Sequence, residues 1–120
     1  TVVGDQTGVP TWAGWIAEAT ASIGAQLFRD DDPSDSGLYH LTGRGQTSWY
    51  GFAQAIFAQF ERAVTVEPVP SSEYPTPAAR PTYTVLDSRR VADTFEIDRP
   101  TWTEQLARFA AEAVDHRAAA

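Results

Sequence analysis

The residue types that carry most enzymatic chemistry are scarce in this chain of 120 residues. It contains no Cys and no Lys, so thiolate catalysis, Cys-based metal sites, Schiff-base chemistry and a Tyr–Lys proton-donating pair cannot be assembled from it. None of its four tyrosines has a cation four residues further along, the spacing at which such a cation would lower the phenol pKa. We therefore predict no catalytic residue in this chain.

The remaining chemical motifs are weak. His40 falls in an expected strand and His116 near the C-terminal end, and a single strand histidine is more often a half-buried polar partner than a base. Gly43-Arg44-Gly45 lacks the further glycine and the downstream acidic residue of a dinucleotide-binding loop, so it predicts an ordinary turn. The acidic segment 30–37 lacks the closing Glu of a calcium loop and predicts a solvated connection.

Charge restricts the partners. The net charge is −7, which disfavours general binding to nucleic acid or to an anionic membrane. No apolar run approaches membrane-spanning length and no signal peptide is evident, so we expect a soluble, cytoplasmic domain. Only the stretch 73–90 is locally cationic, with three arginines against two acids. Arg80 lies within it, and its planar guanidinium suits a diphosphate; solvation at the surface is an equal alternative.

Spacing and punctuation predict a small mixed α/β domain that spans residues 1–120, with short strands and about four helices. It is too small to hold a complete doubly wound nucleotide-binding sheet. Helices are expected at 12–28, at 49–60, at 88–95 and from 102 onwards, and strands at 1–4, 37–42, 64–69 and 83–86. Residues 70–81 carry four prolines and predict a long loop of the kind that often binds ligands.

Local signals refine the helices. Thr11 and Thr47 are expected as N-caps, and Thr101 with Glu104 forms a capping box. The helix at 49–60 carries an aromatic stripe, for which packing in the core is favoured over a cofactor-stacking surface. The rings are numerous enough for part of this face to meet a partner domain.

Several runs of the sequence belong together. They are residues 2–12, which include Asp5-Gln6-Thr7-Gly8-Val9-Pro10-Thr11, then 37–41, 47–53, 72–81 and 85–87. The most specific is Tyr-Pro-Thr-Pro-Ala-Ala-Arg-Pro at 74–81. In this order they resemble the C-terminal portion of the dTDP-4-dehydrorhamnose reductase family, which belongs to the extended short-chain dehydrogenase/reductases.

The resemblance implies NADPH-dependent reduction of the 4-keto group of a dTDP-6-deoxy sugar on the way to dTDP-L-rhamnose. In that family an N-terminal Rossmann domain carries the cofactor and the catalytic Thr, Tyr and Lys. The chain would then be the sugar-nucleotide-binding C-terminal lobe without its Rossmann domain. It would bind no cofactor alone, and the missing domain would be its partner.

The same resemblance assigns residues by position. Asp5, Gln6, Pro10 and Thr11 would face the cleft, and residues 74–80 would border the sugar-nucleotide pocket. Within this segment, Tyr74 would lie at the border of the pocket and Arg80 would contact the diphosphate. Glu112 falls where some members hold magnesium at a dimer interface, although a solvated helix residue is favoured there. Trp15 departs from the family, which tends to have an acidic residue at this position.

Three functional hypotheses remain. The first is a substrate-binding lobe that is inactive alone, supported by a chain that begins within a motif and without Met. The second is an independent, non-enzymatic module that binds a sugar nucleotide or a protein, and the third is one half of a split reductase. We also expect self-association through apolar surface that includes Trp12, Trp49 and Phe52.

Overall fold

The computed structural model describes residues 1–30 and 35–118, with side chains described as far as Val114. This part of the chain forms four α-helices, one 3-10 helix and four strands of two residues each, which confirms the predicted mixed α/β architecture. The helices are α1 (Ala13–Asp30), α2 (Trp49–Gln59), α3 (Arg89–Phe95) and α4 (Trp102–Ala118). The other elements are β1 (Val2–Val3), β2 (Thr7–Gly8), β3 (Thr47–Ser48), β4 (Pro68–Val69) and η2 (Ser71–Glu73).

Two small sheets bring distant parts of the sequence together. β1 pairs in parallel with β4, and β2 pairs antiparallel with β3. On the other side of β2, the Thr7 amide donates to the Thr82 carbonyl at 2.8 Å, and the Thr84 amide donates to the Thr7 carbonyl at 2.9 Å. The end of the proline-rich loop is thereby fixed beside β2, opposite the start of α2.

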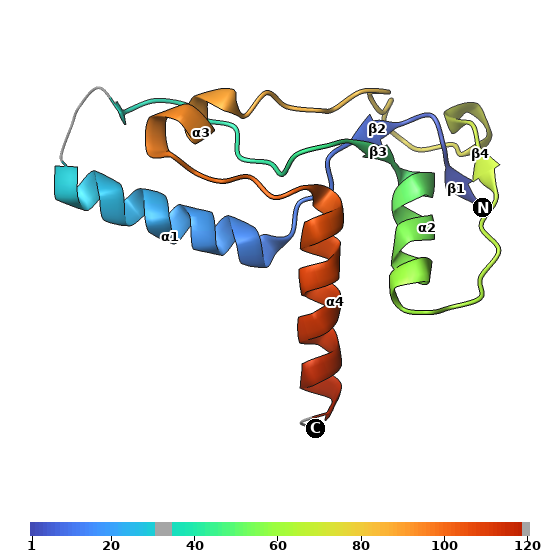
Figure 1. Ribbon diagram of the computed structural model, residues 1–120. Helices are drawn as coiled ribbons and strands as arrows, with labels where there is room; N and C mark the ends of the chain where they lie inside the picture. The colour runs from blue at the N-terminus through green and yellow to red at the C-terminus, as the bar shows by residue number, and fades with distance from the viewer. Residues whose placement is uncertain (31–34, 119–120) are drawn as a thin grey trace.

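Figure 1 shows the helices arranged around this strand region. α2 and α4 lie side by side and are in contact, while α1 extends away on the far side of α4, beneath α3 in this view. Arg108 of α4 forms an ion pair with Glu18 of α1 at 2.7 Å. Gln26 of α1 donates a hydrogen bond to the Phe95 carbonyl at the end of α3.

The buried core is small and comes mainly from three helices. Its apolar members are Val3, Trp15, Ala19, Val91, Phe95, Leu106 and Ala110. α2 buries no residue, so the prediction that its aromatic stripe packs in the core is wrong. Among the described elements, α2 contacts α4, β1 and β3, and on the α4 side Phe52 meets Trp102 edge to face. Trp49 is left 60% exposed.

Of the three predicted helix caps, the one of α4 agrees with the structure. The capping box of α4 is confirmed, since the Thr101 amide donates to Glu104 and the Glu104 amide donates to the Thr101 hydroxyl. Thr47 is not the cap of α2, because the Ser48 hydroxyl accepts from the Gly51 amide, while the Thr47 hydroxyl donates to the Ser48 carbonyl. Nor does Thr11 cap α1, which begins at Ala13, since its hydroxyl donates to the Val9 carbonyl.

The strand predictions were too generous. Residues 37–42 form no strand, because their backbone finds no neighbouring strand; Tyr39 instead packs edge to face on Phe95. The strand expected at 64–69 shrinks to Pro68–Val69, and that at 83–86 to a single bridge between Tyr83 and Thr7. Conversely, β2 lies between the strand expected at 1–4 and the helix expected at 12–28, where no strand was predicted.

Candidate functional site

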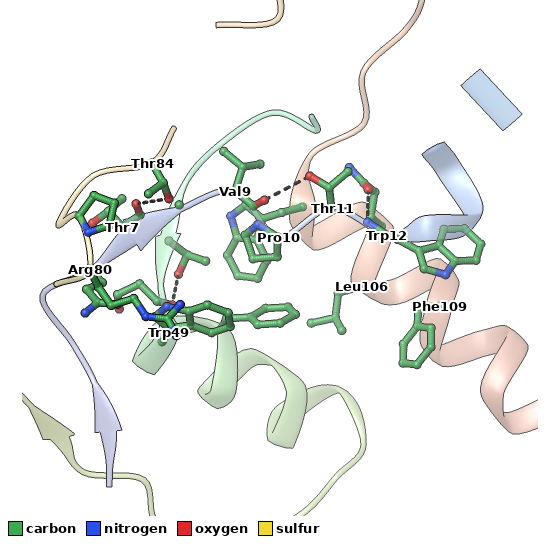
Figure 2. A pocket seen from close by; sticks show the side chains of 18 residues that line it. Thr7, Val9, Pro10, Thr11, Trp12, Trp49, Arg80, Thr84, Leu106 and Phe109 are labelled. Carbon is green, nitrogen blue, oxygen red and sulfur yellow. Dashed lines mark hydrogen bonds between the residues drawn. The ribbon is translucent and has the colours of Figure 1, made fainter. Parts of the chain in front are cut away.

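An open cavity of about 490 Å³ lies where the strand region meets the N-terminal ends of α2 and α4 (Figure 2). Its walls come from β2, the segment that leads into α1, the β3–α2 junction, the end of the proline-rich loop and the first two turns of α4. The lining residues are Gln6, Thr7, Gly8, Val9, Pro10, Thr11, Trp12, Thr47, Ser48, Trp49, Phe52, Arg80, Pro81, Thr84, Trp102, Gln105, Leu106 and Phe109.

Five aromatic side chains dominate the wall of this cavity, namely Trp12, Trp49, Phe52, Trp102 and Phe109. Threonine and serine hydroxyls alternate with them near the strands. A mostly apolar cavity with a few convergent polar groups is typical of a site for a small organic ligand. The size and the aromatic content both suit a ligand with flat rings.

The electrostatic character of the cavity is opposite to that of the chain. Among the residues described, the cavity wall contains one cation, Arg80, and no carboxylate. The ion pairs formed in this part of the chain join Arg29 to Asp30, Arg89 to Asp87 and Arg108 to Glu18. Arg80 takes part in none of them, so its guanidinium is available to an anionic ligand.

The cavity is equipped to bind and not to transfer protons. Its wall holds no His, Asp, Glu or Tyr side chain, and the chain has no Cys or Lys. The guanidinium of Arg80 stays charged in proteins and therefore does not act as an acid or base. The described wall thus offers serine and threonine hydroxyls but no side chain that would act as a general base to activate one of them.

Gln105 organises the wall and was missed by the sequence analysis. Its side chain is 1% exposed, accepts a hydrogen bond from the Trp12 amide at 2.8 Å and donates one to the Pro100 carbonyl at 3.0 Å. It therefore ties the segment before α1 to the start of α4. The available signal was its spacing, three residues after Trp102 and four before Phe109, which places it on the inner face of the helix.

Asp5 and Gln6, both predicted to face the cleft, are engaged with the 3-10 helix η2. The Asp5 carboxylate accepts from the Ser71 amide at 3.0 Å and from the Ser71 hydroxyl, and these bonds lower the pKa of Asp5 below its usual 3.8. The side-chain amide of Gln6 donates to the same hydroxyl at 2.9 Å. Gln6 still lines the cavity, together with Pro10 and Thr11, whereas Asp5 does not.

The other candidates lie away from the cavity. Tyr74 is 54% exposed and is not part of the wall. Glu112 is exposed on α4, and no cluster of three potential metal-ligating side chains occurs in the described part of the chain; its magnesium role stays a prediction. His40 is exposed and not half-buried as expected, because its segment pairs with no strand. The His116 side chain and residues 31–34 of the acidic segment lie outside what the structure describes.

The Gly43–Gly45 turn does not fit a dinucleotide. In the turn before β3, a Cβ atom at Gly43 would lie 2.1 Å from Nε2 of Gln105, and one at Gly45 would lie 3.1 Å from Cδ1 of Trp102. Side chains of α4 therefore fill the space that a pyrophosphate would need. The sequence prediction of an ordinary turn at this position agrees with the structure.

The fold and the cavity together define a small α/β domain with a ligand-sized cavity, whose described wall includes one cation, Arg80. The model of the RmlD substrate binding domain family matches residues 1–114. The chain belongs to this family. The match confirms the resemblance derived from the sequence motifs.

Curated relatives extend the comparison. The chain is 43% identical over 112 residues to the dTDP-4-dehydrorhamnose reductase of Burkholderia thailandensis, which covers 84% of this chain and 37% of the relative. It is 34% identical over 118 residues to the reductase of Salmonella typhimurium, covering 92% of this chain and 38% of the relative. The chain thus matches the substrate-binding portion of these reductases and spans well under half of their length.

Solved structures have the same fold. A dTDP-4-dehydrorhamnose reductase from Clostridium acetobutylicum aligns with a TM-score of 0.75 and 31% identity, over 93% of this chain and 38% of that one. The reductase from Bacillus anthracis, solved in complex with NADP, aligns with a TM-score of 0.72 and 32% identity over 92% of this chain and 37% of that one. None of the helices described here is an apolar segment of membrane-spanning length.

Proposed function

We propose that residues 1–120 form one domain that binds the sugar-nucleotide substrate of a dTDP-4-dehydrorhamnose reductase. The observation that carries the proposal is Arg80, a cation without an ion-pair partner in the described chain, at the wall of a cavity that has no carboxylate. In a chain of net charge −7, this arrangement favours a ligand with a compact anionic group. The diphosphate of a dTDP-sugar is such a group.

In this proposal the domain captures and orients the ligand, and the reduction needs residues that it does not supply. Arg80 holds the diphosphate, and the aromatic wall excludes water from the ring systems. NADPH would supply the hydride when bound, but the Gly43–Gly45 turn is filled by Gln105 and Trp102. We therefore place the dinucleotide site and the proton donor in a partner domain of the kind that carries a Rossmann fold.

The test is isothermal titration calorimetry of the 120-residue chain with dTDP, using the wild type and Arg80→Ala. A charge-assisted contact to phosphate contributes about 1.5–3 kcal/mol, so the variant should bind dTDP at least tenfold more weakly. Arg62→Ala is the matched control, because Arg62 is exposed and outside the cavity; it removes the same charge and should leave the affinity unchanged.

Two results would contradict the proposal. One is wild-type protein that releases no heat with millimolar dTDP, and the other is an equal loss of affinity in Arg80→Ala and Arg62→Ala. A separate assay follows NADPH absorbance in the presence of the keto sugar and the pure chain. We expect no oxidation of NADPH, since the described cavity wall holds no His, Tyr, Asp or Glu side chain that could donate a proton to the reduced ketone.

A further inference from the structure

Two arginines that lie 55 residues apart in the sequence meet where the turn before β3 runs beside the start of α4. The Nε atom of Arg44 donates to the Arg99 carbonyl. In return, the Arg99 guanidinium donates from Nε to the Thr42 carbonyl at 2.9 Å and from Nη2 to the Gly43 carbonyl at 2.8 Å. Each side chain thus reaches across to the backbone of the other segment, and these bonds fix both guanidinium groups.

The backbone that carries the two arginines is also paired. The Arg44 amide donates to the Pro100 carbonyl at 3.0 Å, and the Trp102 amide donates to the Arg44 carbonyl at 3.0 Å. Arg44 and Thr101 form a parallel bridge. The pair is therefore pre-organised, and a ligand that binds to it orders few additional groups.

Neither arginine has a carboxylate partner in the described part of the chain, where the ion pairs involve other arginines. The hydrogen bonds of Arg44 and Arg99 go to carbonyl oxygens, which carry no compensating charge. Burial and the neighbouring charge of Arg44 both lower the pKa of the half-buried Arg99. Because a guanidinium has five N–H donors, each group keeps donors for a further ligand.

Two carboxylates in the surroundings are already engaged. Asp87 forms an ion pair with Arg89 at 2.6 Å, and the hydrogen bonds from Arg89 are the main reason that the pKa of Asp87 is lowered to about 2, with a smaller contribution from the charge of Arg99. Glu104 accepts two hydrogen bonds within the capping box of α4. These bonds lower the pKa of Glu104, and the charge of Arg44 adds to the effect. The arginine pair therefore keeps a positive field that attracts an anion from outside.

The arginine pair is separate from the cavity. Neither Arg44 nor Arg99 belongs to the cavity wall. The glycines on either side of Arg44 pack against Gln105 and Trp102, which do line the cavity, whereas Arg44 itself is exposed. An anion at this pair would therefore be held by residues other than Arg80.

We propose that Arg44 and Arg99 form a second anion site, outside the cavity, that binds a phosphate group. A phosphate group carries up to two negative charges and at least three acceptor oxygens, which match two guanidinium groups better than a single carboxylate does. Free phosphate and the phosphomonoester of a sugar phosphate present this same chemistry. The site is independent of the proposed function, because its residues do not line the cavity.

The test follows the arginine Nε–H signals of ¹⁵N-labelled chain during titration with sodium phosphate at neutral pH, with sodium chloride holding the ionic strength constant. The signals of Arg44 and Arg99 should shift in a saturable manner. The signal of Arg62, which is exposed and belongs to neither the pair nor the cavity wall, should stay in place. The shifts should persist in Arg80→Ala, which removes the cation of the cavity wall.

Variants measure the contribution of each guanidinium. Arg99→Leu should weaken phosphate binding about tenfold, since it removes charge-assisted hydrogen bonds, and Arg44→Gln should weaken it in the same direction. Arg99→Lys keeps the charge but loses the planar fork, so it should recover part of the affinity. Arg62→Gln is the matched control and should bind phosphate like the wild type.

A second titration, with glucose 1-phosphate, distinguishes the two sources of the phosphate group. Both possible results support the site: an affinity equal to that of phosphate assigns it to phosphomonoesters, and a much weaker one assigns it to the free ion.

Three results would overturn the proposal. The first is the absence of a saturable shift at Arg44 and Arg99 in the wild type, a measurement that does not depend on whether any variant folds. The second is the loss of these shifts in folded Arg80→Ala, because phosphate would then bind at the cavity. The third is an equal loss of affinity in Arg99→Leu and Arg62→Gln. Failure of the chain to bind dTDP would contradict the proposed function and leave this site unaffected.

Discussion

At the scale of single residues, Asp5 shows how a carboxylate beside the cavity is kept away from an anionic ligand. Both of its oxygens accept the Ser71 amide, and one also accepts the Ser71 hydroxyl. This binds the start of the proline-rich loop to the end of β1, so that the loop leaves the strand region at a fixed place. Asp5 therefore positions the loop that carries Arg80, and a direct contact with substrate is not needed to explain its presence in the motif.

The hydrogen bonds from Ser71 are the main cause of the lowered pKa of Asp5, and Ser71→Ala should raise it toward 3.8. Because the folded pKa is depressed, the stabilisation from this contact is complete above pH 3.8 and is lost as the pH falls through the folded value. An NMR titration that follows the Asp5 carboxyl chemical shift against pH measures this pKa in the wild type and in Ser71→Ala. Ser72→Ala, one residue further along η2, is the control, and wild-type Asp5 titrating at 3.8 or higher would contradict the account.

At the scale of elements, α4 is the part that assembles the cavity, and Gln105 is its central contact. Gln105→Leu keeps the volume but leaves the Trp12 amide and the Pro100 carbonyl without their partner. An unsatisfied buried polar group costs about 1–3 kcal/mol, so urea unfolding followed by circular dichroism should show a loss of about that size. Gln54→Leu removes an exposed amide bonded to Tyr50 and should change stability by less than about 0.5 kcal/mol; similar losses in both variants would argue against this role for Gln105.

The elements also show which features the sequence could predict. Helices with a clear apolar spacing were found within one or two residues, and the Thr101–Glu104 capping box was predicted correctly because its signal is local. The strands β2 and β3 were not predicted, since a strand is defined by its partner and these two pair across about 40 residues of sequence, and the predicted strands that contain β1 and β4 were too long. The candidate site divides in the same way: the motif residues Gln6 and Arg80 line the cavity, but Gln105 acts through contacts across 93 residues.

At the scale of the whole molecule, the described fold is open. Its accessible surface is 8305 Å², whereas a compact protein of 13.1 kDa exposes about 6,400 Å². The radius of gyration is 17.4 Å, against about 14 Å for a compact chain of this length. Large apolar side chains contribute to the excess, among them Ile16, Leu38, Trp49, Phe109 and Val114.

Such a surface predicts self-association of the isolated chain, because removing apolar surface from water lowers the free energy. Light scattering coupled to size-exclusion chromatography should show a mass that rises from monomer toward dimer or larger species as concentration increases. Ammonium sulfate should strengthen the association, since it favours apolar burial. A constant monomer mass from micromolar to millimolar concentration would contradict this prediction.

The central claim, that this cavity takes a nucleotide diphosphate, is tested most directly by the indole N–H signals of ¹⁵N-labelled chain titrated with dTDP. Of the four tryptophans, Trp12, Trp49 and Trp102 line the cavity, while Trp15 is 4% exposed and lies outside its wall. The account predicts that the three cavity signals shift in a saturable manner and that the Trp15 signal stays in place. No shift at saturating dTDP, or a shift of Trp15 as large as that of the others, would contradict it.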